Sequence, residues 1–206
     1  SDVYKRQEFG ANESFVGKIV NVDEELSEEK ELVQRAENDM LTGVLNKKTM
    51  EKRVSLMLKN RGDKYVIFYM VDLDNFKNVN DTLGHIYGDQ AIVETAQCLN
   101  KVFANQDCIG RLGGDEFAVC VSYQAFDEQG LLEFIGKKAQ EICAGNRRTY
   151  TDNAASVSIT SSIGVAYAPD MGDSFTELYT QADCALYYSK ANGKDQYHIY
   201  SPKDDN

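Results

Sequence analysis

The pattern of apolar and polar positions along the chain predicts alternating helices and strands. Apolar residues recur at helical spacing in four segments, 47–60, 89–103, 129–143 and 175–190. Strands are predicted for the continuous apolar run 65–71, the alternating run 156–168 and the short run 196–200. The polar segments 75–88 and 144–154 predict loops.

A Gly-Gly turn joins a further pair of strands, a hairpin over residues 108–121. Gly113 and Gly114 can take positive φ and leave no side chain over the turn, so that a ligand can approach the backbone. Two acids, Asp115 and Glu116, follow at once. On these residues alone, a plain turn is the favoured interpretation.

These elements predict an α+β fold with a mixed central β-sheet flanked by helices, of the ferredoxin-like or palm type. The hairpin places antiparallel neighbours in the sheet, which disfavours a doubly wound arrangement. The turn-rich segment 39–46 is the predicted domain boundary, and the main domain is predicted at 41–202.

Two shorter parts precede this main domain. Residues 1–25 contain one predicted strand, 15–22, and are interpreted as the tail of an upstream domain. Residues 26–40 predict a charged linker helix with Leu26, Val33 and Met40 at heptad spacing. An exposed acidic helix and a dimer-forming linker both remain open.

The charge of the chain limits its partners. The 206 residues include 22 Lys and Arg against 33 Asp and Glu, a net charge of −11. Nucleic acid is a poor partner for such a chain, because binding it relies on cationic neutralisation. Phosphates are expected to be handled through a divalent metal.

The cysteine content points to a reducing compartment. The cysteines are odd in number, scattered and never in a CxxC pair, which predicts reduced core thiols of a cytoplasmic protein: Cys98, Cys108, Cys120, Cys143 and Cys184. No stretch predicts a membrane span or a signal peptide, so we expect no direct membrane contact. The chain begins at Ser1 without Met, and we expect it to be cut from a longer protein with a sensor or a membrane anchor upstream.

Acidic residues gather where the predicted strand 65–71 ends and where the hairpin turns. If the hairpin lies beside that strand, Asp72 and Asp115 converge, with Asp74 and Glu116 nearby. Four unpaired acids would repel one another and lose hydration. A divalent cation removes this cost, and Mg²⁺ prefers one or two carboxylates together with substrate phosphates. Loop-end acids that simply face water are the alternative.

Several spaced motifs together resemble a known family, the GGDEF-domain diguanylate cyclases. The resemblance runs from about residue 39 to residue 200. Its motifs are Asp39-Met40-Leu41-Thr42-Gly43-Val44-Leu45-Asn46, the string 72–85 with Gly88-Asp89, Gly113-Gly114-Asp115-Glu116-Phe117, Ser162-Ile163-Gly164-Val165-Ala166, the string 182–190, and Gly193-Lys194.

The resemblance implies a palm-like fold and the condensation of two GTP molecules into cyclic di-GMP with release of pyrophosphate. It implies Mg²⁺ or Mn²⁺ held by Asp72, Asp115 and the Leu73 carbonyl. Such a metal polarises the α-phosphate and activates a ribose 3′-OH. Each site takes one GTP, so a homodimer about a two-fold axis is expected. Glu116 matches a further catalytic position, with a solvated hairpin acid as the alternative.

The resemblance also assigns the substrate contacts. Asn80 and Asp89 match the positions that read guanine, and an Asp can accept from both N1–H and the N2 amine, which adenine lacks. A helix N-cap is the alternative for Asp89. The expected phosphate contacts come from the backbone of Asn75 and Phe76, the open turn at Gly113 and Gly114, and the side chains of Lys77, Lys190 and Lys194. Both late lysines could instead complement a helix dipole.

A product-inhibition site, a histidine and the N-terminal segment complete this resemblance. Ala104 stands where many members carry the Arg of an Arg-x-x-Asp product-inhibition site that ends here at Asp107, so tight product inhibition is not expected. His85 is interpreted as a structural, hydrogen-bonding residue. Residues 1–25 resemble the last strand of a PAS sensor domain.

Two other functions remain open beside the cyclase. A catalytically silent module would bind GTP or cyclic di-GMP as a signal. A palm-type cyclase with a mixed purine dinucleotide product is the third reading. The retained acids at the turn favour an active cyclase over the silent module. An intact Asp89 favours guanine, and product analysis with GTP and ATP together decides between the two cyclases.

Overall fold

The computed structural model describes residues 32–103, 108–152 and 155–205. Residues 35–206 form one compact unit and residues 1–34 another. Of the predicted linker helix 26–40, residues 32–37 are described and helical. The predicted strand 15–22, the PAS-like tail 1–25 and the residues 104–107 lie outside the described part. The domain bounds proposed from the sequence therefore stay predictions.

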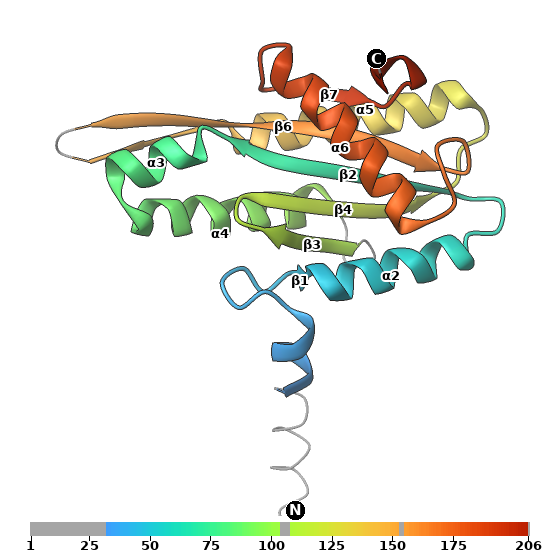
Figure 1. Cartoon of the computed structure of the whole chain (residues 1–206), viewed down its shortest axis with the longest axis horizontal. Coiled ribbons are helices and arrows are strands. Elements are labelled where there is room, and N and C mark those ends of the chain that lie inside the picture. The colour runs from blue at the N-terminus through green and yellow to red at the C-terminus, as the bar shows by residue number, and fades with distance from the viewer. Residues whose placement is uncertain (1–31, 104–107, 153–154, 206) are drawn as a thin grey trace, which may run out of the picture. The chain divides into compact units, whose positions relative to one another are not determined.

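The compact unit is built on one mixed seven-stranded sheet (Figure 1). The strand order is β1-β3-β4-β2-β6-β5, and β7 also pairs with β6. The β1–β3 and β6–β7 pairs are parallel, and the other pairs are antiparallel. The strands are β1 (Leu45–Asn46), β2 (Tyr65–Asp74), β3 (Cys108–Gly113), β4 (Glu116–Tyr123), β5 (Arg148–Thr151), β6 (Ser156–Ala168) and β7 (Tyr197–Ile199). The predicted α+β fold with a mixed sheet is confirmed.

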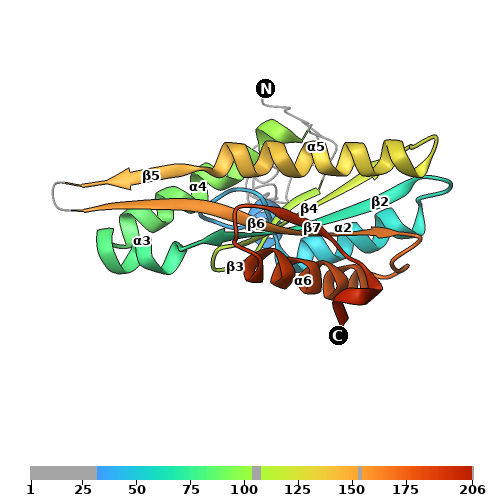
Figure 2. The ribbon, with the colours of Figure 1, turned by 90° about the horizontal axis from the view of Figure 1, so that it is seen from above.

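Helices cover both faces of this sheet, as the view from above shows (Figure 2). They are α2 (Lys47–Lys59), α3 (Phe76–Leu83), α4 (His85–Val102), α5 (Glu128–Asn146) and α6 (Phe175–Ala191), followed by the 3-10 helix η1 (Pro202–Asp205). Helices α4 and α5 pack into one buried apolar cluster, and α2 and α6 pack into another. The result is a helix–sheet–helix sandwich with two cores.

Strand β2 runs through the middle of the sheet and contributes to both cores. Ile67, Tyr69 and Val71 belong to the cluster with α4 and α5, whereas Phe68 and Met70 belong to the cluster with α2 and α6. Because side chains alternate along a strand, Asp72 and Asp74 continue the face toward α6. The apolar strand thus ends with two acids on one face.

Two segments predicted as loops are regular structure, so both predictions were wrong. Segment 75–88 contains α3 and the start of α4. Only Val79 is buried in α3, so the apolar periodicity that signals a helix is too sparse to see. Segment 144–154 contains β5, in which only Tyr150 is buried. An edge strand with polar neighbours lacks the apolar alternation of a half-buried strand.

Close packing sets the position of α6 against the sheet. A Cβ at Gly164 of β6 would collide with the backbone of Ala182 and Leu186 in α6. Glycine therefore lets the helix approach the strand more closely than any side chain would allow. This approach carries the last turn of α6, with Lys190, toward the end of β2.

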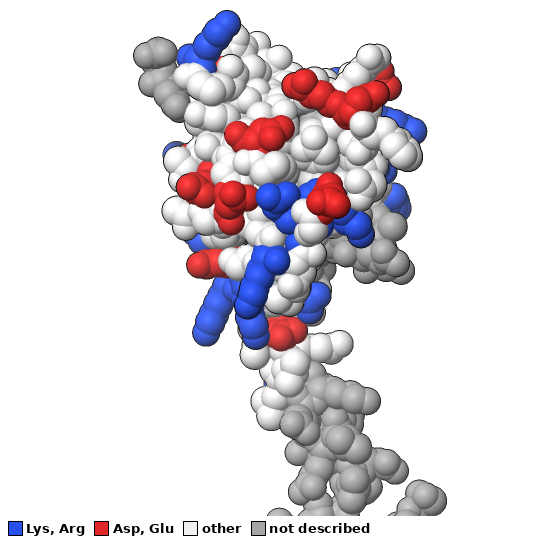
Figure 3. Space-filling model, turned by 90° about the vertical axis from the view of Figure 1, so that its right-hand side faces the viewer, with Lys and Arg blue, Asp and Glu red and all other residues white. Residues whose placement is uncertain are grey.

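The end of the sheet where β2 begins carries mixed charges. Both acidic and basic side chains lie on that face (Figure 3). A hollow of about 570 Å³ lies between the end of α2 and the start of α6, and Arg61 and Asp173 pair across it at 3.6 Å. No helix of the described residues is long and apolar enough to cross a membrane.

Candidate functional site

The structure brings the Gly-Gly turn and the end of β2 together. Asp72 of β2 pairs across the ladder with Glu116 of β4. The amide N–H of Leu73 lies 3.4 Å from the carbonyl oxygen of Asp115. The acids of the turn and of β2 therefore meet at one end of the sheet, as the sequence predicted.

The turn itself needs its glycines for backbone reasons. Gly113 has φ +153° and Gly114 has φ +52°, conformations that L side chains rarely adopt. The ladder is irregular here, with a register shift between Arg111 and Gly113. A Cβ at either glycine would meet nothing within 4 Å, so the space over the turn is open.

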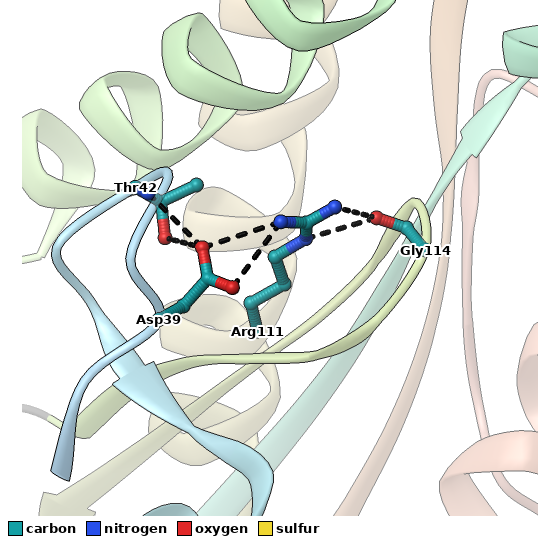
Figure 4. Close-up of polar contacts among 4 residues, drawn as sticks. All are labelled: Asp39, Thr42, Arg111 and Gly114. Atoms are coloured by element: carbon teal, nitrogen blue, oxygen red, sulfur yellow. Dashed lines mark hydrogen bonds and ion pairs between the residues drawn. The ribbon is translucent and has the colours of Figure 1, made fainter. Parts of the chain in front are cut away.

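A guanidinium group ties this turn to the start of the compact unit (Figure 4). Arg111 donates from Nε and Nη2 to the carbonyl oxygen of Gly114, at 2.9 and 2.7 Å. Its Nη1 lies 3.2 Å from both carboxylate oxygens of Asp39. Asp39 also accepts from the backbone N–H and the hydroxyl of Thr42. One side chain thus joins the turn to a segment 72 positions earlier.

The charge of Asp39 is well supported in this network. Burial raises the pKa of Asp39, but the hydrogen bonds from Thr42 and the charge of Arg111 outweigh that effect and leave the pKa below its usual value. Sequence reasoning assigned no role to Arg111 or Asp39. The available signal was local, an Asp followed three residues later by Thr, which is typical of a side-chain-capped turn.

Asp72 is the most perturbed acid of the site. It is 8% exposed, and Lys190 Nζ lies 2.8 Å from its carboxylate. The pKa of Asp72 is raised to about 6. Burial is the largest cause and the charges of Asp115 and Glu116 add to it, whereas the hydrogen bond and charge of Lys190 act in the opposite direction. A buried carboxylate with two acidic neighbours is a setting in which a second cation is favourable.

Asp74 does not join this acidic group, which corrects the expectation of four crowded acids. Its carboxylate accepts from the hydroxyls of Thr160 and Ser162 on β6, both at 2.7 Å. It also accepts from the backbone N–H of Asp195 at 3.1 Å. With these three donors Asp74 is satisfied in a buried position, and the acidic group consists of Asp72, Asp115 and Glu116.

The donor set at this place fits a hard divalent cation. The Asp115 carboxylate is close enough to Asp72 to influence its pKa, and the backbone of Asp115 contacts that of Leu73, whose carbonyl is the third expected donor. In the described ranges no group of three or more His, Cys, Asp and Glu side chains is placed to hold a metal. A site with only two carboxylates suits Mg²⁺, which takes its remaining ligands from water and substrate phosphates.

The expected phosphate contacts surround the same sheet end. Asn75 has a left-handed backbone (φ 63°) and precedes α3, whose first backbone bond runs from Val79 N–H to Asn75 C=O. The preceding amide groups, including those of Phe76 and Lys77, are not used by the helix and face its N-terminal end, a favourable place for an anion. Lys194 Nζ lies 3.2 Å from Asn75 Oδ1.

The expected base-reading residues lie together on α3 and α4. The side chain of Asn80 packs against Gly88, where a Cβ would overlap its amide. Asp89 follows Gly88 and is exposed within α4. Helix α4 begins at His85 with Gly84 as the N-cap residue, so the N-cap alternative for Asp89 is wrong. His85 is exposed in the first turn, and its role stays untested.

Known proteins similar to this chain share its fold. The family model described as "Diguanylate cyclase, GGDEF domain" matches residues 36–196. A solved structure of the coiled coil and GGDEF domain of DgcB from Caulobacter crescentus, in complex with c-di-GMP, is 28% identical with a TM-score of 0.74. That match covers 86% of this chain and 93% of the other.

Two curated relatives are much longer than this chain. The bifunctional diguanylate cyclase/cyclic di-GMP phosphodiesterase MucR of Pseudomonas aeruginosa is 33% identical over 83% of this chain and 24% of its own length. The cyclic di-GMP phosphodiesterase PdeR of Escherichia coli is 29% identical over 94% of this chain and 29% of its own length. The chain thus spans less than a third of either relative. Together, the family match over most of its length and the shared fold show that this chain belongs to the GGDEF domain family.

Proposed function

We propose that this chain is a Mg²⁺-dependent diguanylate cyclase, which condenses two GTP molecules into cyclic di-GMP and releases pyrophosphate. The observation that supports it most is the convergence of Asp72 and Asp115 beside the open N-terminal end of α3. Carboxylates for a metal and amides for a triphosphate then lie at one sheet end. The cytoplasm remains the predicted compartment.

In this proposal each group of residues has a separate task. The free amides at the start of α3, together with Lys77 and Lys194, bind the phosphates. Asn80 and Asp89 select guanine, and Asp72, Asp115 and the Leu73 carbonyl hold the metal. The metal, when bound, supplies positive charge that polarises the α-phosphate and lowers the pKa of the ribose 3′-OH.

Lys190 has a task of its own at the metal-binding acids. Its ammonium balances the Asp72 carboxylate. For a metal to enter, this ion pair must loosen, and Lys190 then becomes available to the substrate phosphates. Glu116 lies across the ladder from Asp72 and adds negative charge beside it, which favours a bound cation.

The reaction joins two GTP molecules, whereas this set of residues holds one. Two chains must therefore present their sites to each other, and a homodimer about a two-fold axis is the simplest arrangement. The upstream part of the longer protein is proposed to control this encounter, in line with relatives that are several times longer than this chain.

A second candidate is a catalytically silent module that binds GTP or cyclic di-GMP. It is favoured by one comparison, since the similar protein PdeR is named as a phosphodiesterase and not as a cyclase. It is disfavoured by the acids at the turn, which a silent module does not need.

Incubation with GTP and Mg²⁺ followed by mass analysis of the products separates these functions. We expect cyclic di-GMP and pyrophosphate from the unaltered chain and no product from Asp115→Ala. A mixture of GTP and ATP tests for a mixed product in the same assay. A dimer that binds GTP but forms no product would contradict the cyclase and support the silent module.

A matched control removes one acid elsewhere. Asp63 is exposed and precedes β2, at the end of the strand opposite Asp72. Asp63→Asn changes the net charge by the same amount as Asp115→Ala and should keep full activity. Loss of activity in both variants would indicate a general charge effect and not a metal site.

A further inference from the structure

A buried carboxylate behind the site holds two distant segments of the chain together. Asp74 is 2% exposed. Its Oδ1 accepts from Ser162, and its Oδ2 accepts from Thr160 and from the backbone N–H of Asp195. The last bond crosses from the end of β2 to the turn after α6, 121 positions later.

Both segments that Asp74 holds contain residues in a left-handed backbone. Asn75, directly after Asp74, has φ +63°, and Lys194 and Asp195 have φ +63° and +49°. For residues other than glycine this conformation costs about 1 kcal/mol or more and persists only where the surroundings enforce it. Such strain is concentrated at functional sites.

Further hydrogen bonds fix the turn after α6 and leave the backbone N–H of Asp195 to bond Asp74. The carboxylate of Asp195 accepts from Nε of Arg147 at 2.7 and 3.0 Å, and the N–H of Lys194 donates to the carbonyl of Ser189 at 3.1 Å. The hydrogen bond from the backbone N–H of Asp195 to the Asp74 carboxylate joins this turn to β2. In consequence Lys194 and Asn75 meet, with Nζ and Oδ1 3.2 Å apart.

We propose that Asp74 is a positioning residue for the triphosphate: by holding the backbone at Asp195 and preceding Asn75, it places the Lys194 ammonium at the N-terminal end of α3. This inference rests on the proposed function and deepens it, because it assigns a task to an acid that does not hold the metal. Asp74 acts through Lys194 and does not touch the substrate.

The test measures the binding of two guanine nucleotides that differ in the number of their phosphates. The probes are GMP and a GTP analogue with a methylene between the α- and β-phosphates, which cannot release pyrophosphate. Calorimetric titration with Mg²⁺ is expected to show that Asp74→Ala weakens the analogue by about tenfold, as Lys194→Ala does, and leaves GMP unchanged. The double variant Asp74→Ala/Lys194→Ala should be no weaker than Lys194→Ala alone, because both changes remove the same contact.

A conservative variant and a structural control sharpen the result. Asp74→Asn can keep all three bonds, since its carbonyl accepts from Thr160 and Asp195 while its amide donates to the Ser162 hydroxyl. It should therefore bind the analogue as the unaltered chain does. Thr160→Val removes one bond to Asp74 but keeps the bond from Asp195, and it should lower thermal stability without changing the preference for the analogue over GMP.

Several outcomes would overturn the proposal. Equal losses for GMP and the analogue in Asp74→Ala would show a purely structural role, as would additive losses in the double variant. If Asp74→Ala does not fold, a tenfold loss of analogue binding in Asp74→Asn would contradict the hydrogen-bond account. If the unaltered chain binds neither nucleotide, the proposed function itself fails, which is a different result.

Discussion

At the scale of single residues, environment separates acids that look alike in the sequence. Asp72 and Asp74 stand two positions apart on the same face of β2. Asp74 has three hydrogen-bond donors, whereas Asp72 has one lysine and two acidic neighbours. Asp74 has its hydrogen bonds satisfied without a cation, and Asp72 does not. This difference is why we assign a metal to Asp72 and a structural bond network to Asp74.

The pKa of Asp72 predicts how stability depends on pH without divalent metal. The folded pKa of about 6 lies above the unfolded value of 3.8, so between these values the folded chain holds more protons than the unfolded chain. This group therefore lowers stability as pH rises through that window. Asp72→Asn cannot titrate, and relative to the unaltered chain it should gain about 1–3 kcal/mol from about pH 4 to about pH 7.

Chemical denaturation of both chains at the two pH values, in the presence of a chelator, measures this change. The part of the gain that depends on pH is the relevant quantity, because the lost ion pair with Lys190 shifts stability by a separate amount. A difference between the two chains that does not vary with pH would contradict the raised pKa.

Asp89 offers a second test at this scale, of base selection. Asp89→Asn replaces an acceptor pair with an amide that cannot accept from both guanine donors. We expect GTP binding to weaken by about 1–3 kcal/mol, with thermal stability unchanged because the side chain is exposed within α4. Titration with GTP and thermal unfolding measure the two effects, and Asp63→Asn is the control. Unchanged GTP affinity would exclude Asp89 from base reading.

At the scale of elements, the site depends on segments that are tied together. The hairpin turn is held by Arg111 to the Asp39–Thr42 segment, and α6 lies against β6 because Gly164 leaves space for it. Arg111 and Gly164 are not themselves among the expected nucleotide-binding residues. The Arg111 contact fixes the turn that carries Asp115. The close packing at Gly164 fixes α6, whose last turn carries Lys190.

The guanidinium fork of Arg111 bonds Gly114 and Asp39 at the same time, so its positive charge alone cannot replace it. Lysine keeps the positive charge but cannot bond Gly114 and Asp39 at once with planar geometry. Arg111→Lys should therefore destabilise the chain by about 1–3 kcal/mol and lower cyclase activity, because the turn is no longer held.

Denaturant unfolding and product formation measure these two effects. Arg53→Lys is the matched control. Within the described part of the chain Arg53 forms an exposed ion pair with Glu37 at 3.6 Å, so its replacement should change stability little. An Arg111→Lys chain with the stability and activity of the unaltered chain would show that the fork is dispensable.

At the scale of the whole molecule, one chain carries one half of the proposed reaction. Its net charge of −11 makes two copies repel each other, so the encounter of two such chains should be weak. We expect the rate of cyclic di-GMP formation per chain to rise with protein concentration and, at low concentration, to be raised by added salt that screens the repulsion.

Product formation across a dilution series, with sedimentation of the same samples, measures this dependence. A crosslinked or artificially dimerised chain should lose the concentration dependence. A rate per chain that is constant down to concentrations where only monomer sediments would contradict the two-chain reaction.

Local pattern was sufficient for most of the framework. The strand 156–168 and the helix at 47–60 were predicted nearly to the residue, because most of their apolar positions follow one period. The sequence also placed Asp72 at the end of a buried strand and the glycines at a turn. These features depend on neighbouring residues only, and therefore on information that lies within a short window.

The tertiary structure decided what short windows do not contain. Helix α3 buries one residue and strand β5 another, so their regular structure comes from packing against the rest of the sheet. The separation of Asp74 from the acidic group depends on donors 86, 88 and 121 positions away. The sequence alone determined which residues are chemically able to hold a metal, a phosphate and a base. Only the fold decided which of them meet, because a carboxylate's charge state and partners depend on contacts between distant segments.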